Sequence, residues 1–250
     1  MRKMSEMSKS VIDVPFDALG SFKERPNRFL AIFDIELPDG KVLTDQMVHV
    51  HDPGRLKELL FQGNRGLLRK VPPGKRKTQW DLLAARARDE WVFIHSAYHR
   101  RISEWVLKDP TVSPFGELEG FKAEVNVGGH SRIDFVLTKK DGSKVALEVK
   151  GCSLAIDGVA LFPDAPTERG TRHIRTLMEL KKKGMDAAVM ILVFRPEAKC
   201  FAPKEDTDPV FAETFYQAKK MGLGVYPLLF RYDEKSMNIM YIDEIPVCER

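Results

Sequence analysis

Asp134, Glu148 and Lys150 stand in two short segments in which charged and apolar residues alternate. Such alternation predicts two strands whose charged side chains share one face. Paired carboxylates are ligands suited to a hard divalent cation such as Mg²⁺ or Mn²⁺. A lysine beside them can orient or deprotonate a metal-bound water, or stabilise charge on a phosphate. These residue types therefore indicate a divalent-metal site that acts on phosphate groups.

The residues between the two segments predict how the strands pair. A hairpin with the three-residue loop Lys140-Asp141-Gly142, with Gly142 in the left-handed conformation, sets Asp134 directly opposite Glu148. Like charges in that arrangement destabilise a sheet, so a cation is expected beside them. Spacing alone leaves open the alternative that these are solvated charges on an edge hairpin.

A polar stripe on a later helix supplies further candidates. The pattern predicts a helix over residues 168–183, with Thr167 as its N-cap and Gly184 after its end. Ile174 and Leu177 should pack on the sheet. Arg169 and His173 border this packed face, so we expect them to reach the end of a neighbouring strand and contact a phosphate there.

The composition bounds the class of protein. The 250 residues suffice for two modest domains, with 43% hydrophobic and 30% charged residues. The sequence contains no apolar run of about 18 residues, so no membrane-spanning helix is expected. Three widely spaced cysteines, Cys152, Cys200 and Cys248, argue against a disulfide framework and a structural zinc site, and so favour the cytoplasm.

The first half of the chain reads as short strands after a loose arm at residues 1–14. Strands are expected near residues 29–37, 42–50, 67–71, 79–87 and 91–94, with one or two helical turns over 55–60. About five strands with one short helix predict a small OB-type barrel. The second half alternates helices and strands, which predicts an α/β domain with a mixed sheet.

A basic segment lies within the first half. Between Asn64 and Arg88 there are eight basic residues and one acid, Asp81, in a chain of net charge +4. Such a segment is either a solvated face or a surface that contacts the phosphates of a nucleic acid. Arg76 and Lys77 are its central candidates.

The sequence resembles the sugar fermentation stimulation protein A (SfsA) family. In the first half the resemblance rests on residues 28–31, the Asp39-Gly40 turn, Gly54-Arg55 and Arg76-Lys77-Thr78. In the second half the matching stretches are Ser131-Arg132-Ile133-Asp134-Phe135, Glu148-Val149-Lys150, Phe162-Pro163-Asp164-Ala165, Thr167-Glu168-Arg169-Gly170, His173, Asp208 and residues 245–247.

The resemblance implies an OB-like barrel over residues 15–95 and a restriction-endonuclease-like domain of the PD-(D/E)xK type over 96–250. Asp134, Glu148 and Lys150 fall on the catalytic pattern of that superfamily, and the carbonyl of Val149 is implied as a further metal ligand. Glu104 resembles a supporting helix glutamate, with Glu124 as a second candidate. The residues expected to contact nucleic acid are Arg55, Arg76, Lys77, Arg132, Arg169 and His173.

Four positions depart from the family pattern. Asp52 and Pro53 replace the usual Asn and Thr, and His99 stands where Asn is usual. A further departure is Pro166, at a position where a small β-branched residue is common. The added charge of Asp52 argues against phosphate binding by that loop. Two functions remain: a metal-dependent nuclease acting on DNA, or RNA, largely without sequence preference, and a non-catalytic DNA-binding regulator of sugar metabolism. A third alternative makes the hairpin charges structural and the partner a protein.

Overall fold

The computed structural model describes residues 8–72, 74, 76–127 and 132–249, so Lys75 and Ser131 of the predicted motifs lie outside the described residues. The chain divides into two compact units. The first runs to Tyr98 and also contains Phe194–Glu197 and Leu229–Asp243; the second contains the rest. The sequence predicts that the chain divides once, at residue 95. The structure differs in that Phe194–Glu197 and Leu229–Asp243 belong to the first unit. No helix among the described residues is long and apolar enough to cross a membrane.

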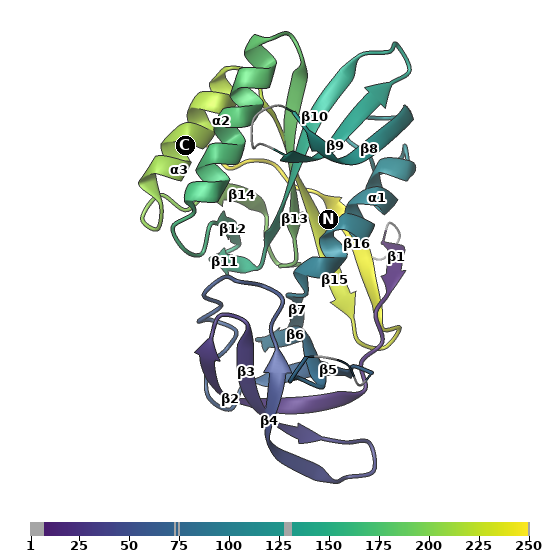
Figure 1. The fold of residues 1–250 in the computed structure, drawn as a ribbon, viewed down its shortest axis with the longest axis vertical. Coiled ribbons are helices and arrows are strands. Elements are labelled where there is room, and N and C mark those ends of the chain that lie inside the picture. The colour runs from purple at the N-terminus through teal and green to yellow at the C-terminus, as the bar shows by residue number, and fades with distance from the viewer. Residues whose placement is uncertain (1–7, 73, 75, 128–131, 250) are drawn as a thin grey trace. The chain divides into compact units, whose positions relative to one another are not determined.

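The first unit is built on an OB barrel (Figure 1). The strands follow the order β4-β3-β2-β5-β6, and a parallel pairing of β4 with β6 closes them into a barrel. β7 extends β6 as an antiparallel hairpin. The strand bounds are β2 Ala18–Asn27, β3 Leu30–Glu36, β4 Val42–His49, β5 Arg65–Lys70, β6 Trp80–Ala87 and β7 Glu90–Phe93.

Close packing inside the barrel explains the glycine at position 66 in β5. Phe33 and Leu82 are fully buried. A Cβ added to Gly66 would lie 2.8 Å from the Leu82 Cδ1 atom and 2.9 Å from the Phe33 Cε1 atom. Only glycine leaves room for these side chains to meet at the barrel centre.

The one or two helical turns predicted over residues 55–60 are found as a single turn. Leu56, Leu59 and Leu60 are buried at helix-like spacing, but they lie in a turn. The backbone N–H groups of Leu59 and Leu60 both donate to the Leu56 carbonyl. Leu56 itself has a φ of 49°, a left-handed conformation, so the turn begins at this residue and does not extend before it.

Part of the predicted N-terminal arm is ordered. Lys9–Asp13 form β1, which pairs antiparallel with β16 (Asn238–Glu244). The Tyr232 hydroxyl donates to the Val14 carbonyl at 2.7 Å. The Trp91 indole N–H donates to Glu234 at 2.7 Å. Segments from both ends of the chain therefore complete the first unit.

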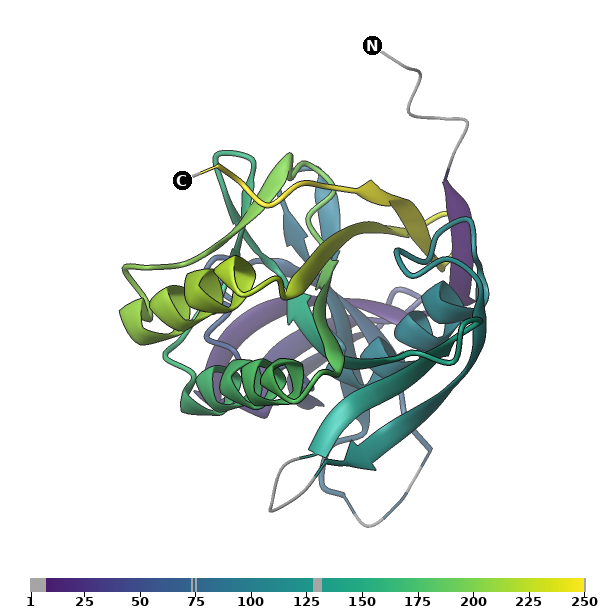
Figure 2. The ribbon, with the colours of Figure 1, turned by 90° about the horizontal axis from the view of Figure 1, so that it is seen from above.

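The second unit is a mixed-sheet α/β domain. β10 pairs antiparallel with β9 and parallel with β13, after a crossover that contains α2. Helices α2 and α3 lie side by side (Figures 1 and 2). The bounds are α1 His99–Lys108, β8 Leu118–Asn126, β9 Arg132–Lys139, β10 Lys144–Cys152, α2 Glu168–Lys182, β13 Asp186–Val193, α3 Pro209–Lys220 and β15 Gly224–Asp233, of which residues from Leu229 belong to the first unit.

A small three-stranded sheet leads into α2. β11 (Leu154–Ile156) and β12 (Val159–Phe162) form a hairpin, and β12 pairs in parallel with β14 (Cys200–Pro203). Asp157 and Gly158 form the two-residue turn with φ values of 48° and 79°. This small sheet therefore sets the backbone that enters the first turn of α2.

A disulfide joins Cys200 to Cys248, so the prediction of no disulfide is wrong. Hydrogen bonds between Phe201 in β14 and the C-terminal segment bring the two cysteines together, with 5.2 Å between their Cα atoms. Their separation of 48 residues gave no sign of this contact. The cysteine argument for a compartment is therefore lost. Cys152 is buried outside this disulfide, and its thiol donates to the Leu161 carbonyl at 3.3 Å.

Candidate metal centre

The β9–β10 hairpin brings the two predicted carboxylates together. Thr138 pairs with Lys144 and Phe135 with Leu147, and one further step in this register sets Asp134 opposite Glu148. The Asp134 Oδ2 atom accepts a 2.7 Å hydrogen bond from the backbone N–H of Val149. Gly142 has the expected φ of 80°. The predicted hairpin register is confirmed.

Glu148 is buried, with only 1% of its surface exposed. Its Oε1 atom accepts hydrogen bonds from the Lys150 ammonium group, at 2.5 Å, and from His173. Within the described part of the chain its Oε2 atom has no hydrogen-bond partner. A buried carboxylate oxygen without a partner is costly, so this atom is available to a cation.

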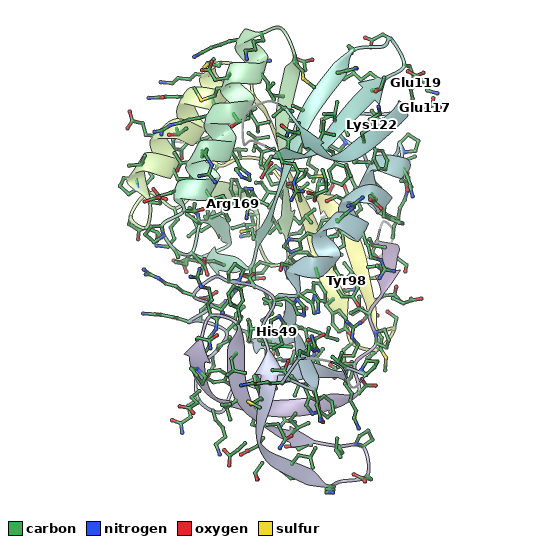
Figure 3. The ribbon with its side chains drawn as sticks, in the orientation of Figure 1. His49, Tyr98, Glu117, Glu119, Lys122 and Arg169 are labelled. Carbon is green, nitrogen blue, oxygen red and sulfur yellow. A yellow bond between two sulfur atoms is a disulfide. The ribbon has the colours of Figure 1, made fainter. Side chains whose placement is uncertain are left out.

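Helix α2 supplies His173 and Arg169. Thr167 caps the helix by accepting a hydrogen bond from the Gly170 N–H at 3.0 Å, as predicted. Arg169 lies on the first turn (Figure 3), and its Nε–H donates to His173 Nε2 at 3.3 Å. Because Nε2 accepts from Arg169, the Nδ1 atom is the one that donates to Glu148. Arg169, His173 and Glu148 thus form one hydrogen-bonded chain.

The start of α2 is itself held by the start of α3. Asp208 is the N-cap of α3 and accepts a hydrogen bond from the Phe211 N–H at 2.9 Å. Its other oxygen accepts a 2.7 Å hydrogen bond from the Thr167 N–H. One buried carboxylate therefore fixes the beginning of both helices.

The surroundings drive the two carboxylates toward different protonation states. Burial and the negative charge of Glu148 raise the pKa of Asp134, and the Val149 N–H and Lys150 offset this only in part. Burial would also raise the pKa of Glu148, but the His173 hydrogen bond and the Lys150 charge outweigh it and lower that pKa. Asp134 is thus the carboxylate that needs additional positive charge.

A cleft of about 370 Å³ opens over Asp134. Arg132 at its edge pairs with Glu124 at 2.9 Å. The cleft gathers more basic than acidic side chains, which suits an anionic substrate at an acidic floor. Its lining residues are Glu124, Arg132, Ile133, Asp134, Arg169, Arg172, His173 and Thr176.

The structure places the two candidates for the supporting glutamate differently. Glu104 lies on α1 and pairs with Arg100 at 2.9 Å, and it does not line the cleft. Glu124, the second candidate, does line it and contributes to the raised pKa of Asp134. Val149 contributes its N–H group to Asp134, while its role as a carbonyl ligand stays a prediction.

Three predicted contacts with nucleic acid lie in the first unit. Arg55 and Lys77 are exposed, whereas Arg76 donates to Asp81 at 2.8 Å. The loop before Arg55 is held by Arg25, whose guanidinium donates to the Asp52 and Gly54 carbonyls. The Asp52 carboxylate accepts from the Gly54 N–H, so its charge is partly used within the loop.

Sequence reasoning missed an aromatic position on the barrel. Phe29 has 47% of its surface exposed, with the Arg28 guanidinium 5.5 Å from its ring centre. The His49 ring stacks against Phe29, with 6.4 Å between the ring centres. An exposed aromatic residue beside arginine could have been noted from the sequence, because bases stack on such residues in OB folds.

A closed OB barrel and a mixed-sheet α/β domain with an acidic centre define a two-domain class of protein. Residues 24–94 match the family model described as the SfsA N-terminal OB domain, and residues 97–236 match the sugar fermentation stimulation protein RE domain. The chain belongs to the sugar fermentation stimulation protein family.

Curated relatives extend over nearly the whole chain. A sugar fermentation stimulation protein homolog from Methanococcoides burtonii is 41% identical, covering 95% of each chain. A homolog from Sulfurisphaera tokodaii is 43% identical, covering 91% of this chain and 89% of that one. The solved structure of Pyrococcus furiosus SfsA in complex with Ca²⁺ has a TM-score of 0.84 and 26% identity, covering 96% of this chain and 100% of that one.

Proposed function

We propose that this chain binds DNA and hydrolyses its phosphodiester bonds at a divalent-metal centre formed by Asp134 and Glu148. The observation that carries the proposal is the unsatisfied Glu148 Oε2 atom beside Asp134, whose pKa is raised by burial and by the negative charge of Glu148. Both features are relieved by a cation. Cleavage is expected to show little sequence preference, because contacts to the phosphate backbone carry no sequence information.

The donor set favours Mg²⁺ or Mn²⁺. Carboxylate oxygens, with the Val149 carbonyl as a further candidate, are hard ligands. The relative from Pyrococcus furiosus was solved with Ca²⁺, another hard cation, which supports a divalent ion in the family. When bound, Mg²⁺ or Mn²⁺ supplies Lewis-acid activation of water and neutralises charge on the phosphate.

The protein side chains have distinct roles in this proposal. Lys150 holds Glu148 ionised, and its ammonium group can orient the attacking water and stabilise negative charge on the phosphate. Arg169 and Arg132 line the cleft, where they bind the phosphate and orient its scissile bond. His173 is a positioning residue, because it joins Arg169 to Glu148.

The direct test incubates the purified full-length protein with single- and double-stranded DNA and RNA, in Mn²⁺, Mg²⁺ or EDTA. Cleavage should occur with a metal ion and stop in EDTA. Asp134→Asn and Lys150→Met should each reduce the cleavage rate by about 10²-fold or more. Duplex binding, measured in parallel by fluorescence anisotropy, should persist in both variants.

Matched variants make the assay specific. Glu119→Gln on β8 and Lys144→Met on β10 remove exposed charges of the same kinds and should leave cleavage unchanged. Cleavage that survives both Asp134→Asn and Lys150→Met would exclude this centre. Binding without cleavage under every metal condition would instead establish the non-catalytic DNA-binding function.

A further inference from the structure

Two histidines and an aspartate meet in the first unit, away from any residue assigned a role above except Arg76. His51 follows the end of β4, Asp81 lies in β6 and His95 follows β7. β4 and β6 are the strands whose parallel pairing closes the barrel, with His49 opposite Asp81. The cluster therefore joins three chain segments at the closure of the barrel.

The side chains converge on one point. The His51 Nε2 atom lies 3.2 Å from Asp81 Oδ1, and the His95 Nε2 atom lies 3.7 Å from Asp81 Oδ2. One ligand atom from each residue can be chosen so that all three lie within 4.8 Å of one another. A tetrahedral zinc site with bonds of about 2.0–2.1 Å places its ligand atoms about 3.3 Å apart. Small side-chain adjustments would suffice to reach that arrangement.

Both histidines face Asp81, but their buried ring nitrogens make no hydrogen bond of good geometry among the described residues. His95 has 3% of its surface exposed, and neither of its ring nitrogens has a hydrogen-bond partner among the described residues. The buried Nε2 atom of His51 likewise makes no hydrogen bond to a described residue. The imidazole rings of His51 and His95 stack with their centroids 3.6 Å apart, and the Nε2 atom of each ring faces the Asp81 carboxylate.

Arg76 satisfies only part of this cluster. Its guanidinium lies 2.8 Å from Asp81 Oδ1 and balances the charge of the carboxylate. It provides nothing for the imidazole nitrogens, which need a donor or a metal ion to offset their burial. Two imidazoles and one carboxylate are a ligand set for zinc and similar transition metals, whereas Mg²⁺ prefers oxygen ligands.

We propose that His51, Asp81 and His95 bind a zinc-type transition-metal ion that fastens the closure of the barrel. His51 has 21% of its side chain exposed, which leaves access for the ion and a water molecule as a fourth ligand. The ion competes with Arg76 for Asp81. The site is independent of the carboxylate centre in the second unit and of the proposed function.

Zinc binding to the full-length protein tests the proposal. The protein carries Asp134→Asn to weaken the carboxylate centre, is stripped with EDTA, and is titrated with Zn²⁺ by calorimetry. Adding His51→Gln or His95→Gln should remove one bound equivalent, or weaken its binding more than about 10-fold. His49→Gln, a matched change two residues from His51, should retain that equivalent.

Two further measurements keep the test decisive if a histidine variant folds poorly. Co²⁺ added to the stripped parent should give visible absorption typical of nitrogen and oxygen ligands, which Zn²⁺ then abolishes. Arg76→Met should bind Zn²⁺ at least as tightly as the parent, because it removes the competing cation. Unchanged zinc stoichiometry and affinity in folded His51→Gln and His95→Gln, or no Co²⁺ spectrum in the parent, would overturn the proposal.

Discussion

Asp134 and Glu148 have the same charge but different degrees of compensation. Glu148 receives Lys150 and His173 at one oxygen, and its pKa falls despite its burial. Among the described residues, Asp134 accepts one hydrogen bond, from the Val149 N–H; this bond and the more distant Lys150 charge do not prevent its pKa from rising. A site with two acids and one local lysine is thus short of positive charge until a cation enters.

This shortage predicts that Asp134→Asn stabilises the metal-free protein. Asparagine keeps an oxygen that can accept the Val149 hydrogen bond and removes the charge facing Glu148. The free energy of unfolding in EDTA should rise by about 1 kcal/mol, as measured by urea denaturation. The same variant should lose the additional stability that Mn²⁺ gives the parent protein.

A matched change separates this effect from a general loss of negative charge. Glu119→Gln removes an exposed carboxylate from β8, so its stability in EDTA should change by less than about 0.5 kcal/mol. A less stable Asp134→Asn protein in EDTA would contradict a shortage of positive charge at the metal-free centre.

At the element scale, Asp208 connects the starts of two helices. It caps α3 and also holds the N–H of Thr167, the cap of α2. The position of Arg169 and His173 therefore depends on a residue that has no place in the metal centre itself.

We expect Asp208→Ala to cost about 2 kcal/mol in the free energy of unfolding, because it removes the cap of α3 and the buried hydrogen bond that holds Thr167. DNA cleavage should fall as well, since the first turn of α2 loses its anchor. Thermal and urea denaturation measure the first effect, and the metal-dependent cleavage assay measures the second. Asp208→Asn retains one acceptor and should lie between the parent and alanine proteins; equal stability in all three would exclude this role.

The elements differ in how well the sequence predicted them. The hairpin register followed from Gly142 and from strict alternation, and the Thr167 cap from helix-start chemistry. β2 was missed because Gly20 and Pro26 lower its strand propensity, although its inward face packs in the barrel. The β11–β12 hairpin had a readable Asp157-Gly158 signal that was overlooked.

Long-range contacts were beyond sequence reasoning. The hydrogen bond from Lys150 to Glu148 was foreseeable on one strand, but the pairing of His173 with the buried oxygen required the placement of α2. The His51–Asp81–His95 cluster likewise arises from barrel closure between distant segments. Periodicity assigns faces to elements but does not determine which elements meet.

At the scale of the whole molecule, several basic side chains in the basic segment of the first unit already have partners within that unit. Arg65 pairs with Glu36, Arg69 donates to Tyr98, and Arg86 lies over the Trp91 ring at 5.1 Å. A chain of net charge +4 therefore depends on a few exposed residues, rather than on a general basic surface, to contact phosphates.

Arg55→Ala and Lys77→Ala should accordingly weaken duplex binding in a salt-dependent way. Each lost phosphate contact reduces the slope of log affinity against log salt concentration by about 0.9. Fluorescence anisotropy across a salt series measures this slope. Lys140→Ala, which removes a lysine paired with Glu117 on the hairpin of the second unit, should leave the slope unchanged. Unaltered slopes in the first two variants would remove this surface from the DNA-binding proposal.

The first unit is completed by Leu229–Asp243, which include the partners of Val14 and Trp91. Ribosomes add about 5–20 residues per second, so these strands are made roughly ten seconds after the barrel. During that interval the nascent barrel lacks the Tyr232 and Glu234 contacts, and β1 lacks its partner strand β16. The domain that is synthesised first is therefore among the last to be finished, and the order of translation differs from the order in which the native structure is completed.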